Sequence, residues 1–184
     1  MYAAVRAPRP ARPGHVAKRD NEYRRCGTAN LFGIVEPKAG RHLNCVTPDR
    51  AGVAFARVIR DLVAAYPRTR TIHLVLDNLN IHHERSLVRA FGPYKGHRLW
   101  QRLTVHYTPK HGSWLNQAEL ELSLIARQAL GSDRVPTRAE MADRVRAWTR
   151  RANRRKTCIT WRFTRKHARA KFRYDHRTFK RSKP

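Results

Sequence analysis

The sequence predicts an α/β fold in which an antiparallel hairpin leads into a parallel sheet flanked by helices. Two short strand-like runs, at 30–36 and 41–47, are separated by a turn that contains Pro37 and Gly40, as in a β-hairpin. After them, apolar stripes at helical spacing alternate with short β-branched runs, which is the pattern of βα units. With 184 residues, the chain has the size of one domain with its own core.

Periodicity, capping residues and breakers give the individual elements. The first helix ends before Pro67, and Thr137 and Glu140 have the T-x-x-E spacing of a capping box that starts the last helix. The continuous apolar run before Asp77 predicts a buried central strand. The predicted elements are strands at 30–36, 41–47, 71–76 and 103–107, and helices at 50–65, at 84–91, from Ser113 or Trp114 to about Leu130, and from Thr137 to about Ala152.

Composition divides the chain into three parts. Residues 1–25 are rich in Arg and Pro and poor in large apolar residues, so they predict an extended basic lead-in. Residues 26–155 hold the predicted domain. Residues 156–184 form a basic helical tail, and from Arg150 onward the chain has 15 Lys or Arg against one acid, Asp175. Aromatic residues interleave with these charges, which suits phosphate contact and base stacking or packing back onto the domain.

The charge balance indicates a polyanionic partner. Lys and Arg number 40 against 13 acids, a formal net charge of +27, which argues against an ordinary metabolic enzyme and favours nucleic acid. No apolar run has the roughly 20 residues of a membrane span, and no secretory signal is present, so we expect no membrane partner. The three cysteines, Cys26, Cys45 and Cys158, are odd in number and far apart. They favour a reducing cytoplasm.

Two acids lack a simple local role. Asp77 ends the predicted buried strand, and α/β folds place their sites at the carboxyl ends of parallel strands; it could instead cap the next helix. In the helix that starts at Ser113 or Trp114, residues 115, 118, 122, 125 and 129 form an apolar stripe, so helical geometry puts Glu119 at its inner edge and Glu121 further out. A carboxylate at such an edge is either paired with Arg or held by a metal.

An Asp and a Glu from these two elements suit Mg²⁺ or Mn²⁺, which prefer carboxylate oxygens and substrate phosphate. We therefore predict that Asp77 and Glu119 are catalytic and metal-binding, with carboxyl groups roughly 4–8 Å apart, the range that a shared metal or metal pair spans. Glu121 is predicted to be the more exposed of the two glutamates.

The residues around these acids resemble a bacterial insertion-sequence transposase of the mariner superfamily, which has a DDE-type catalytic domain. The matching stretches are His73-Leu-Val-Leu-Asp-Asn-Leu-Asn-Ile-His82, His106-Tyr-Thr-Pro-Lys-His-Gly-Ser-Trp-Leu-Asn-Gln-Ala-Glu119, Ile159-Thr-Trp-Arg-Phe-Thr164 and, less specifically, Gly27-Thr-Ala-Asn-Leu-Phe32. The resemblance runs from about Pro13 to Tyr174.

This resemblance implies an RNase H-like fold, a divalent metal, and cleavage and transfer of DNA strands. Asp77 takes the place of the family's second acid, Glu119 that of the third, and Asn116 matches the Asn that precedes this Glu. The candidate DNA-contacting residues are Asn78, His82, Lys110, Trp114, Asn116, Arg162, Arg165 and Lys166.

The family's first acid lies on a strand before the hairpin, and that strand is not found here. We therefore expect an N-terminally truncated RNase H-like sheet, from a truncated copy or one product of a split reading frame, with Glu36 as a weak substitute acid. The partner would be a second copy or an upstream-frame chain. A non-catalytic basic DNA-binding remnant is the alternative function, and a ribosomal-type RNA-binding protein is opposed by the two specific motifs.

Overall fold

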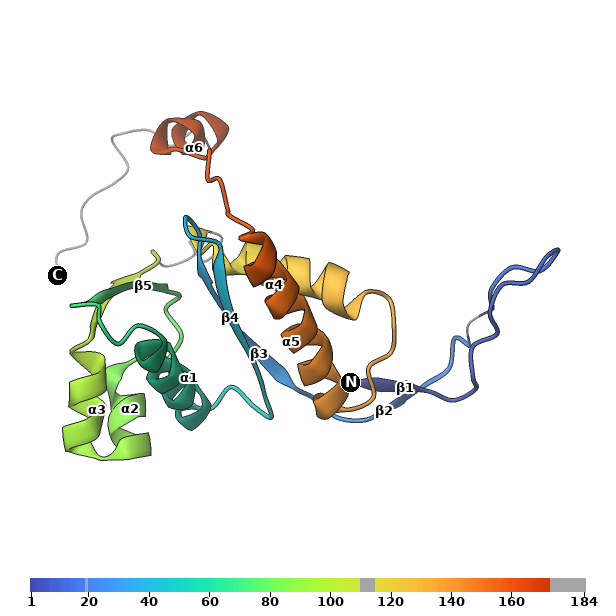
Figure 1. The fold of residues 1–184 in the computed structure, drawn as a ribbon, viewed down its shortest axis with the longest axis horizontal. Helices are drawn as coiled ribbons and strands as arrows, with labels where there is room; N and C mark the ends of the chain where they lie inside the picture. Colours follow the sequence, from blue (N-terminus) through green and yellow to red (C-terminus); the bar gives the residue numbers. More distant parts are fainter. Residues whose placement is uncertain (19, 110–114, 173–184) are drawn as a thin grey trace.

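A computed structural model of the chain describes residues 1–18, 20–109 and 115–172 (Figure 1). It is a mixed α/β structure in which helices lie on both sides of a central hairpin. The strands are β1 (Tyr2–Ala4), β2 (Tyr23–Arg25), β3 (Asn30–Glu36), β4 (Arg41–Thr47), β5 (Ile72–Leu76) and β6 (Leu103–Tyr107). The helices are α1 (Gly52–Ala65), α2 (Glu84–Phe91), α3 (Pro93–Trp100), α4 (Ala118–Ile125), the π-helix η2 (Ala126–Leu130), α5 (Arg138–Arg155) and α6 (Arg165–Phe172).

The hairpin β3–β4 is confirmed with its predicted bounds. Its antiparallel register runs from Asn30 opposite Thr47 to Glu36 opposite Arg41. Gly40 closes the turn at a φ of +61°, in the left-handed region that favours glycine. A Cβ on Gly40 would also lie 2.6 Å from the backbone carbon of Lys156, so no larger residue fits there.

The hairpin separates two hydrophobic cores, because successive strand residues point to opposite faces. On one face, Phe32, Ile34 and Leu43 pack against a core built on α1, α2 and β6. On the other, Leu31 and Val46 pack against α4, η2 and α5. The residues buried in the first core are Phe55, Ala56, Ile59, Leu62, Val63, Leu87 and Leu103; those in the second are Ile125, Val145, Trp148 and Ala152.

The strands β5 and β6 pair in parallel, as predicted, but their sheet is not buried on both faces. Leu74 and Leu76 pack on the first core, whereas His73 and Val75 are exposed. The three strand pairs form three separate two-stranded sheets rather than one continuous sheet. The prediction of a fully buried central strand is therefore wrong, because no layer of the described residues covers this face.

The helices α1, α2 and α5 confirm their predictions, and Oγ1 of Thr137 accepts a hydrogen bond from the amide of Glu140 at 3.1 Å, as a capping box requires. The helix α3 was not predicted. It begins directly after Gly92 and crosses close to α2 at Gly96, where a Cβ would lie 2.7 Å from the Cα of Val88.

The helix α4 begins at Ala118, four residues after the later of its two predicted starts. Ser113 and Trp114 themselves lie outside the described residues, and Leu115 belongs to a short 3₁₀ segment. After Ile125 the helix continues to Leu130 with wider π turns, shown by the hydrogen bond from the Gly131 amide to the Ala126 carbonyl.

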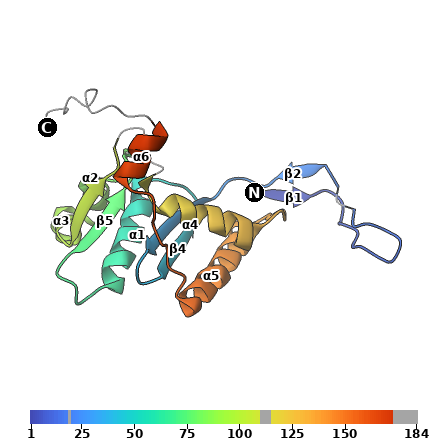
Figure 2. The same ribbon diagram turned by 90° about the horizontal axis from the view of Figure 1, so that it is seen from above.

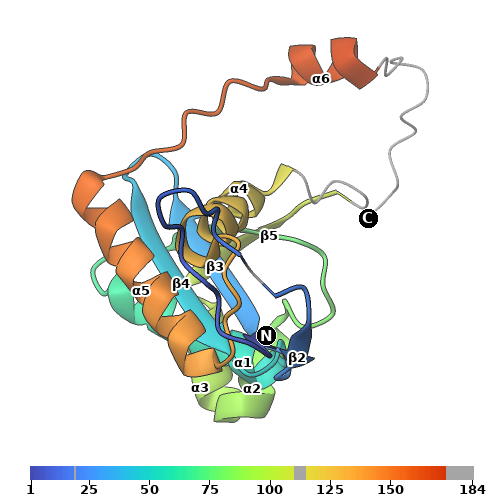
Figure 3. The same ribbon diagram turned by 90° about the vertical axis from the view of Figure 1, so that its right-hand side faces the viewer.

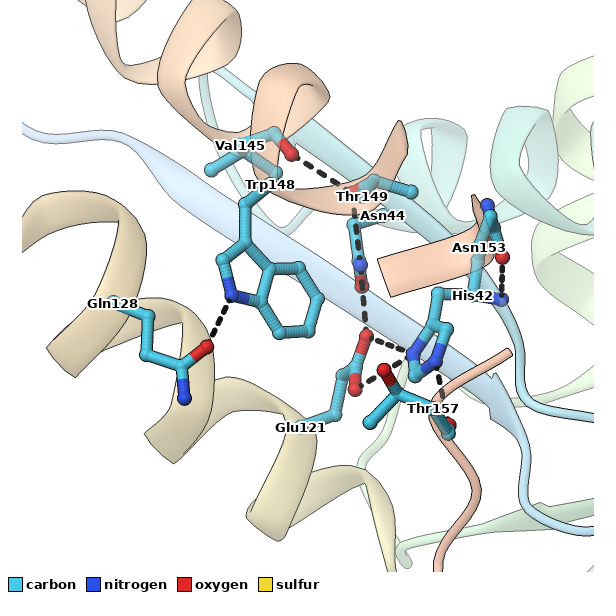
Figure 4. A network of polar contacts seen from close by, with 9 residues as sticks. All are labelled: His42, Asn44, Glu121, Gln128, Val145, Trp148, Thr149, Asn153 and Thr157. Carbon is cyan, nitrogen blue, oxygen red and sulfur yellow. Dashed lines mark hydrogen bonds and ion pairs between the residues drawn. The ribbon is translucent and has the colours of Figure 1, made fainter. Parts of the chain in front are cut away.

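Glu121 is fully buried, so the prediction that it is the more exposed glutamate is wrong (Figure 4). Both of its carboxylate oxygens lie 2.9 Å from Nδ1 of His42, which is also buried. Asn44 donates a further hydrogen bond to Oε1, at 2.9 Å. The helical wheel failed because Leu115, which set its phase, is not part of the helix; α4 therefore turns Glu121 and Ile125 inward.

The same network ties α5 to the hairpin. Nε2 of His42 faces the carbonyl of Thr157 at 3.0 Å, and since a carbonyl only accepts, Nε2 carries a hydrogen. Asn153 exchanges two hydrogen bonds with the backbone of His42, at 2.8 and 3.0 Å. Trp148 lies edge-on to the His42 ring and donates to Gln128 of η2 at 2.8 Å (Figure 4). Hence β4, α4 and α5 share one buried polar network.

The N-terminal residues, predicted to be an extended basic lead-in, form a projecting hairpin (Figures 1 and 2). The strands β1 and β2 pair antiparallel, and isolated bridges join Arg9 to Lys18 and Arg12 to His15. Arg134 anchors its base by donating to the carbonyls of Asp20 and Glu22, each at 2.5 Å.

At the other end, α6 lies away from the sheets on an extended connection (Figure 3). None of the helices in the described ranges is long and apolar enough to cross a membrane.

The buried network predicts that the fold depends on the Glu121 carboxylate. Glu121→Ala removes the carboxylate and leaves His42 and Asn44 without their partner, so the free energy of unfolding should fall by about 3–5 kcal/mol. Glu119→Ala, two residues away on an exposed position, should change it by about 0.5 kcal/mol or less. Urea denaturation followed by circular dichroism measures both, and a similar decrease in the two variants would contradict the structural role of Glu121.

Candidate active site

A cavity of about 430 Å³ lies between the edges of β3 and β5. It is lined along its length by residues 30–35 of β3 and residues 73–77 at and after β5. α1 contributes Phe55, Val58 and Ile59, and α4 with its approach contributes residues 115–119 and Leu122. Asp77 and Glu119, the two acids predicted to be catalytic, both line it. The separation of roughly 4–8 Å between their carboxyl groups stays a prediction.

Asp77 follows the last residue of β5 and is held by His82. Nδ1 of His82 lies 2.5 Å from Oδ1 of Asp77 and 3.2 Å from its backbone carbonyl. The close approach to Oδ1 is an ion-pair contact without hydrogen-bond geometry, so this buried oxygen has no hydrogen-bond partner among the described residues. The His82 ring is buried against Phe55, with ring centroids 4.7 Å apart. A buried carboxylate oxygen without a partner is costly unless a ligand meets it.

Tyr107, at the end of β6, fixes the loop that carries His82. Its hydroxyl donates to the His82 carbonyl at 2.6 Å and lies 3.2 Å from Nδ1 of His83. Burial raises the pKa of the Tyr107 phenol, which favours the protonated form that this bond needs. The ends of the two parallel strands are thus joined through a tyrosine that the sequence analysis did not single out.

Glu119 lies in the first turn of α4. It is exposed to solvent and also lines the cavity. Asn116 shapes the start of this helix: its Oδ1 accepts from the Ala118 amide, and its carbonyl accepts from the Glu119 amide, both at 3.1 Å. Asn116 therefore positions Glu119 as well as lining the cavity itself.

The predicted DNA-contacting residues are distributed over three places. His82 and Asn116 line the cavity, whereas Asn78 is exposed beside it. Arg162 and Lys166 are exposed on the tail, and Arg165 begins α6. Lys110 and Trp114 lie outside the described residues.

No third acid joins Asp77 and Glu119 among the described residues that line the cavity. Within the described ranges, no group of three or more His, Cys, Asp or Glu side chains could hold a metal ion. Glu36, the weak substitute, lines no part of this cavity; its carboxylate is exposed and accepts a hydrogen bond from the Tyr66 hydroxyl at 2.8 Å. The two carboxylates fit a divalent cation by their chemistry. Oδ1 of Asp77, which makes no hydrogen bond although Nδ1 of His82 lies 2.5 Å away, is a candidate ligand.

The sequence analysis missed three components of this site: Arg50, which lines the cavity just before α1, Tyr107, and the edge of β3. Nothing in the sequence marks Arg50 or the edge of β3 as part of the site, because spacing along the chain does not reveal which strand edges face each other. The position of Tyr107 within the His106-Tyr-Thr-Pro stretch was the one hint that the sequence offered.

Comparison with known families identifies the domain that carries this cavity. Residues 2–142 match the family model described as DDE superfamily endonuclease. The chain belongs to this family. Membership implies transposase-type DNA cleavage with DNA as the substrate, and the mixed α/β fold of this DDE endonuclease is consistent with an RNase H-like domain. No curated protein and no solved structure matches the chain.

The role of Tyr107 is testable by titration. Since its folded pKa is raised, the stability from its hydroxyl is present below the ordinary tyrosine value of 10.0 and is lost as the pH rises through the folded pKa. Tyr107→Phe should therefore show a smaller loss of thermal stability between pH 9 and pH 11 than the wild type. Tyr94→Phe, at a side chain that is 79% exposed, is the control and should follow the wild type; an unchanged pH profile in Tyr107→Phe would contradict the assignment.

Proposed function

We propose that this DDE endonuclease is the catalytic part of an insertion-sequence transposase of the mariner superfamily, with Asp77 and Glu119 as two of its catalytic, metal-binding acids. The observation that carries the proposal is that a strand-end Asp and a helix-borne Glu, 42 positions apart in the sequence, line one cavity. The resemblance of the surrounding motifs supports the same assignment.

The chemistry is phosphoryl transfer: the oxygen of water or of a DNA 3′-hydroxyl forms a new bond to phosphorus while the bridging oxygen of the cleaved strand leaves. A bound Mg²⁺ or Mn²⁺ would supply stabilisation of the negative charge on the phosphate and on the leaving oxygen. His82 would orient Asp77, and Asn116 would orient Glu119. The basic surface would hold the DNA, and the reaction would take place in the cytoplasm, on the nucleoid.

Two carboxylates are fewer than the three that the family pattern requires. We therefore expect the third acid to come from a second polypeptide, such as the product of a neighbouring reading frame or a second copy. The alternative function, a non-catalytic DNA-binding remnant, is favoured by the lack of a third acid among the described residues around this cavity.

Metal binding separates these two functions. With Mn²⁺ in excess over its dissociation constant, the wild type should unfold at a higher temperature, because the ion binds the native state; a hundredfold excess is worth about 2.7 kcal/mol. Asp77→Asn and Glu119→Gln should lose this shift, whereas Asp61→Asn, at a side chain that is 65% exposed, should keep it. A remnant without a metal site would show the same shift, or none, in all four proteins.

In a nicking assay on supercoiled DNA with Mg²⁺ or Mn²⁺, the purified chain alone should be inert. Nicking by the wild type that disappears in Asp77→Asn would contradict the expectation that a different polypeptide supplies the third acid, and would mean that Glu36 or a second copy of this chain provides it.

DNA binding should depend mainly on phosphate contacts made by the tail. Deleting residues 160–184 should flatten the slope of log affinity against log salt by about 0.9 for each phosphate that the shortened protein no longer neutralises. The control replaces two exposed arginines of α2, Arg85 and Arg89, by glutamine and should leave the slope nearly unchanged. A deletion that leaves the slope intact would place the binding surface elsewhere, with the N-terminal hairpin as the next basic segment to test.

A further inference from the structure

Two histidine side chains meet on the exposed face of the β5–β6 pair. Nδ1 of His73 lies 3.1 Å from Nε2 of His106, and the two rings are stacked, with an angle of 18° between their planes and centroids 5.4 Å apart. His106 lies opposite Val75 in the parallel register, and Val75 shares a strand face with His73. The two imidazoles therefore come from neighbouring strands and lie diagonally on one face, where both residues are exposed.

The acids proposed to be catalytic are not ligands of this pair. Asp77 follows His73 by four residues, about 13 Å along an extended strand. Within the described ranges, no His, Cys, Asp or Glu side chain joins the two histidines as a third potential metal ligand. The outer nitrogens, Nε2 of His73 and Nδ1 of His106, make no hydrogen bond to any described residue, so they are open to water.

The distance between the two facing nitrogens is that of two ligands of one metal ion. Zinc–nitrogen bonds of about 2.0–2.1 Å, at angles of about 90–110° around the ion, place the nitrogens about 2.8–3.4 Å apart. The 3.1 Å between Nδ1 of His73 and Nε2 of His106 lies within this range.

Without an ion, the two nitrogens share one hydrogen in an N–H···N hydrogen bond. The terminal torsion of histidine is broad, and exposed rings have room to turn. A small rotation of each ring would aim both lone pairs at one ion, while the ring hydrogens move to the two outer nitrogens.

The donor atoms determine which ions this pair would bind. Neutral imidazole suits Zn²⁺, Ni²⁺ and Cu²⁺, whereas Mg²⁺ prefers oxygen ligands and keeps much of its water. With two protein ligands, the remaining positions of the ion would be filled by water. The strands fix both ligands in advance, and an ion held between them would cross-link a sheet that has only two strands.

We propose that His73 and His106 form a binding site for a divalent transition-metal ion such as Zn²⁺. The ion bridges β5 to β6 and stabilises the strand pair that Asp77 follows. This site is separate from the one proposed for Mg²⁺ or Mn²⁺, because it uses nitrogen ligands and neither of the two acids. It therefore does not depend on the proposed function.

Isothermal titration calorimetry of the full chain with Zn²⁺ tests the site, in the absence of DNA and with Mg²⁺ in large excess to occupy oxygen-ligand sites. His73→Gln and His106→Gln should each weaken Zn²⁺ binding at least tenfold. The double variant should bind no more than twofold more weakly than either single one, because both histidines hold the same ion. His15→Gln removes an exposed histidine of the N-terminal hairpin and should bind like the wild type; circular dichroism checks that all four variants fold.

Cu²⁺ tests the location on the protein. Because this ion is paramagnetic, one equivalent should broaden the amide NMR signals of residues 72–76 and 103–107 before the others. Its electron paramagnetic resonance spectrum should show coupling to two nitrogen nuclei. The selective broadening should vanish in His73→Gln and persist in His15→Gln.

Two results would overturn the proposal. An unchanged Zn²⁺ affinity in both single histidine variants would leave the pair as a hydrogen bond only. Loss of Zn²⁺ binding in Asp77→Asn but not in the histidine variants would place the ion at the acids instead. Zn²⁺ binding that needs both histidines, without any thermal shift from Mn²⁺, would support this site while the proposed function fails alone.

Discussion

The buried pair of Glu121 and His42 is the interaction on which the position of the candidate active site depends. An ionisable pair that is fully removed from water is stable only when its remaining hydrogen-bonding groups are met, and here Asn44 and the Thr157 carbonyl meet them. The pair joins the first turn of α4 to the turn end of the hairpin, where His42 is the second residue of β4. Since Glu119 lies in that same turn, its place beside the cavity follows from the anchoring of Glu121.

The hairpin has a second role, because it is shared by two cores that otherwise have little contact. Its residues divide alternately between the α1 side and the α5 side, so each core stabilises the other through one strand pair. β5 and β6 belong only to the first core. The two proposed catalytic acids thus come from opposite sides of the hairpin: Asp77 follows a strand of the first core, and Glu119 lies on a helix of the second. The cavity is where these two halves meet.

Local patterns predicted most of the elements, since periodicity, the turn at Gly40 and the cap at Thr137 are decided by neighbouring residues. Local patterns could not predict which face of α4 turns inward. The chain enters that helix through a 3₁₀ segment, and the apolar residue Leu115 lies before the helix. The short helix α3 was not predicted, because only Gly92 separates it from α2 and the two helices therefore follow each other without a connecting loop. Asp77 and Glu119 stood out as candidates because acids are scarce in so basic a chain. The pairing of Glu121 with His42 joins residues 79 positions apart, and nothing along the sequence marks such a contact.

The π-helix after α4 makes the spacing of this segment as important as its composition. Glu121, before the π-helix, is hydrogen-bonded to His42, and Gln128, within the π-helix, accepts a hydrogen bond from Trp148. A π turn holds about one residue more than an α turn, and each residue of an α-helix accounts for about 100° of rotation. A deletion of one residue between Glu121 and Gln128 would restore regular α-helical turns, and the two residues could not then both keep their hydrogen bonds. The extra residue acts as a spacer that lets Glu121 and Gln128 keep both contacts, so an insertion or deletion here would strain the anchor of Glu121 and, through it, the position of Glu119.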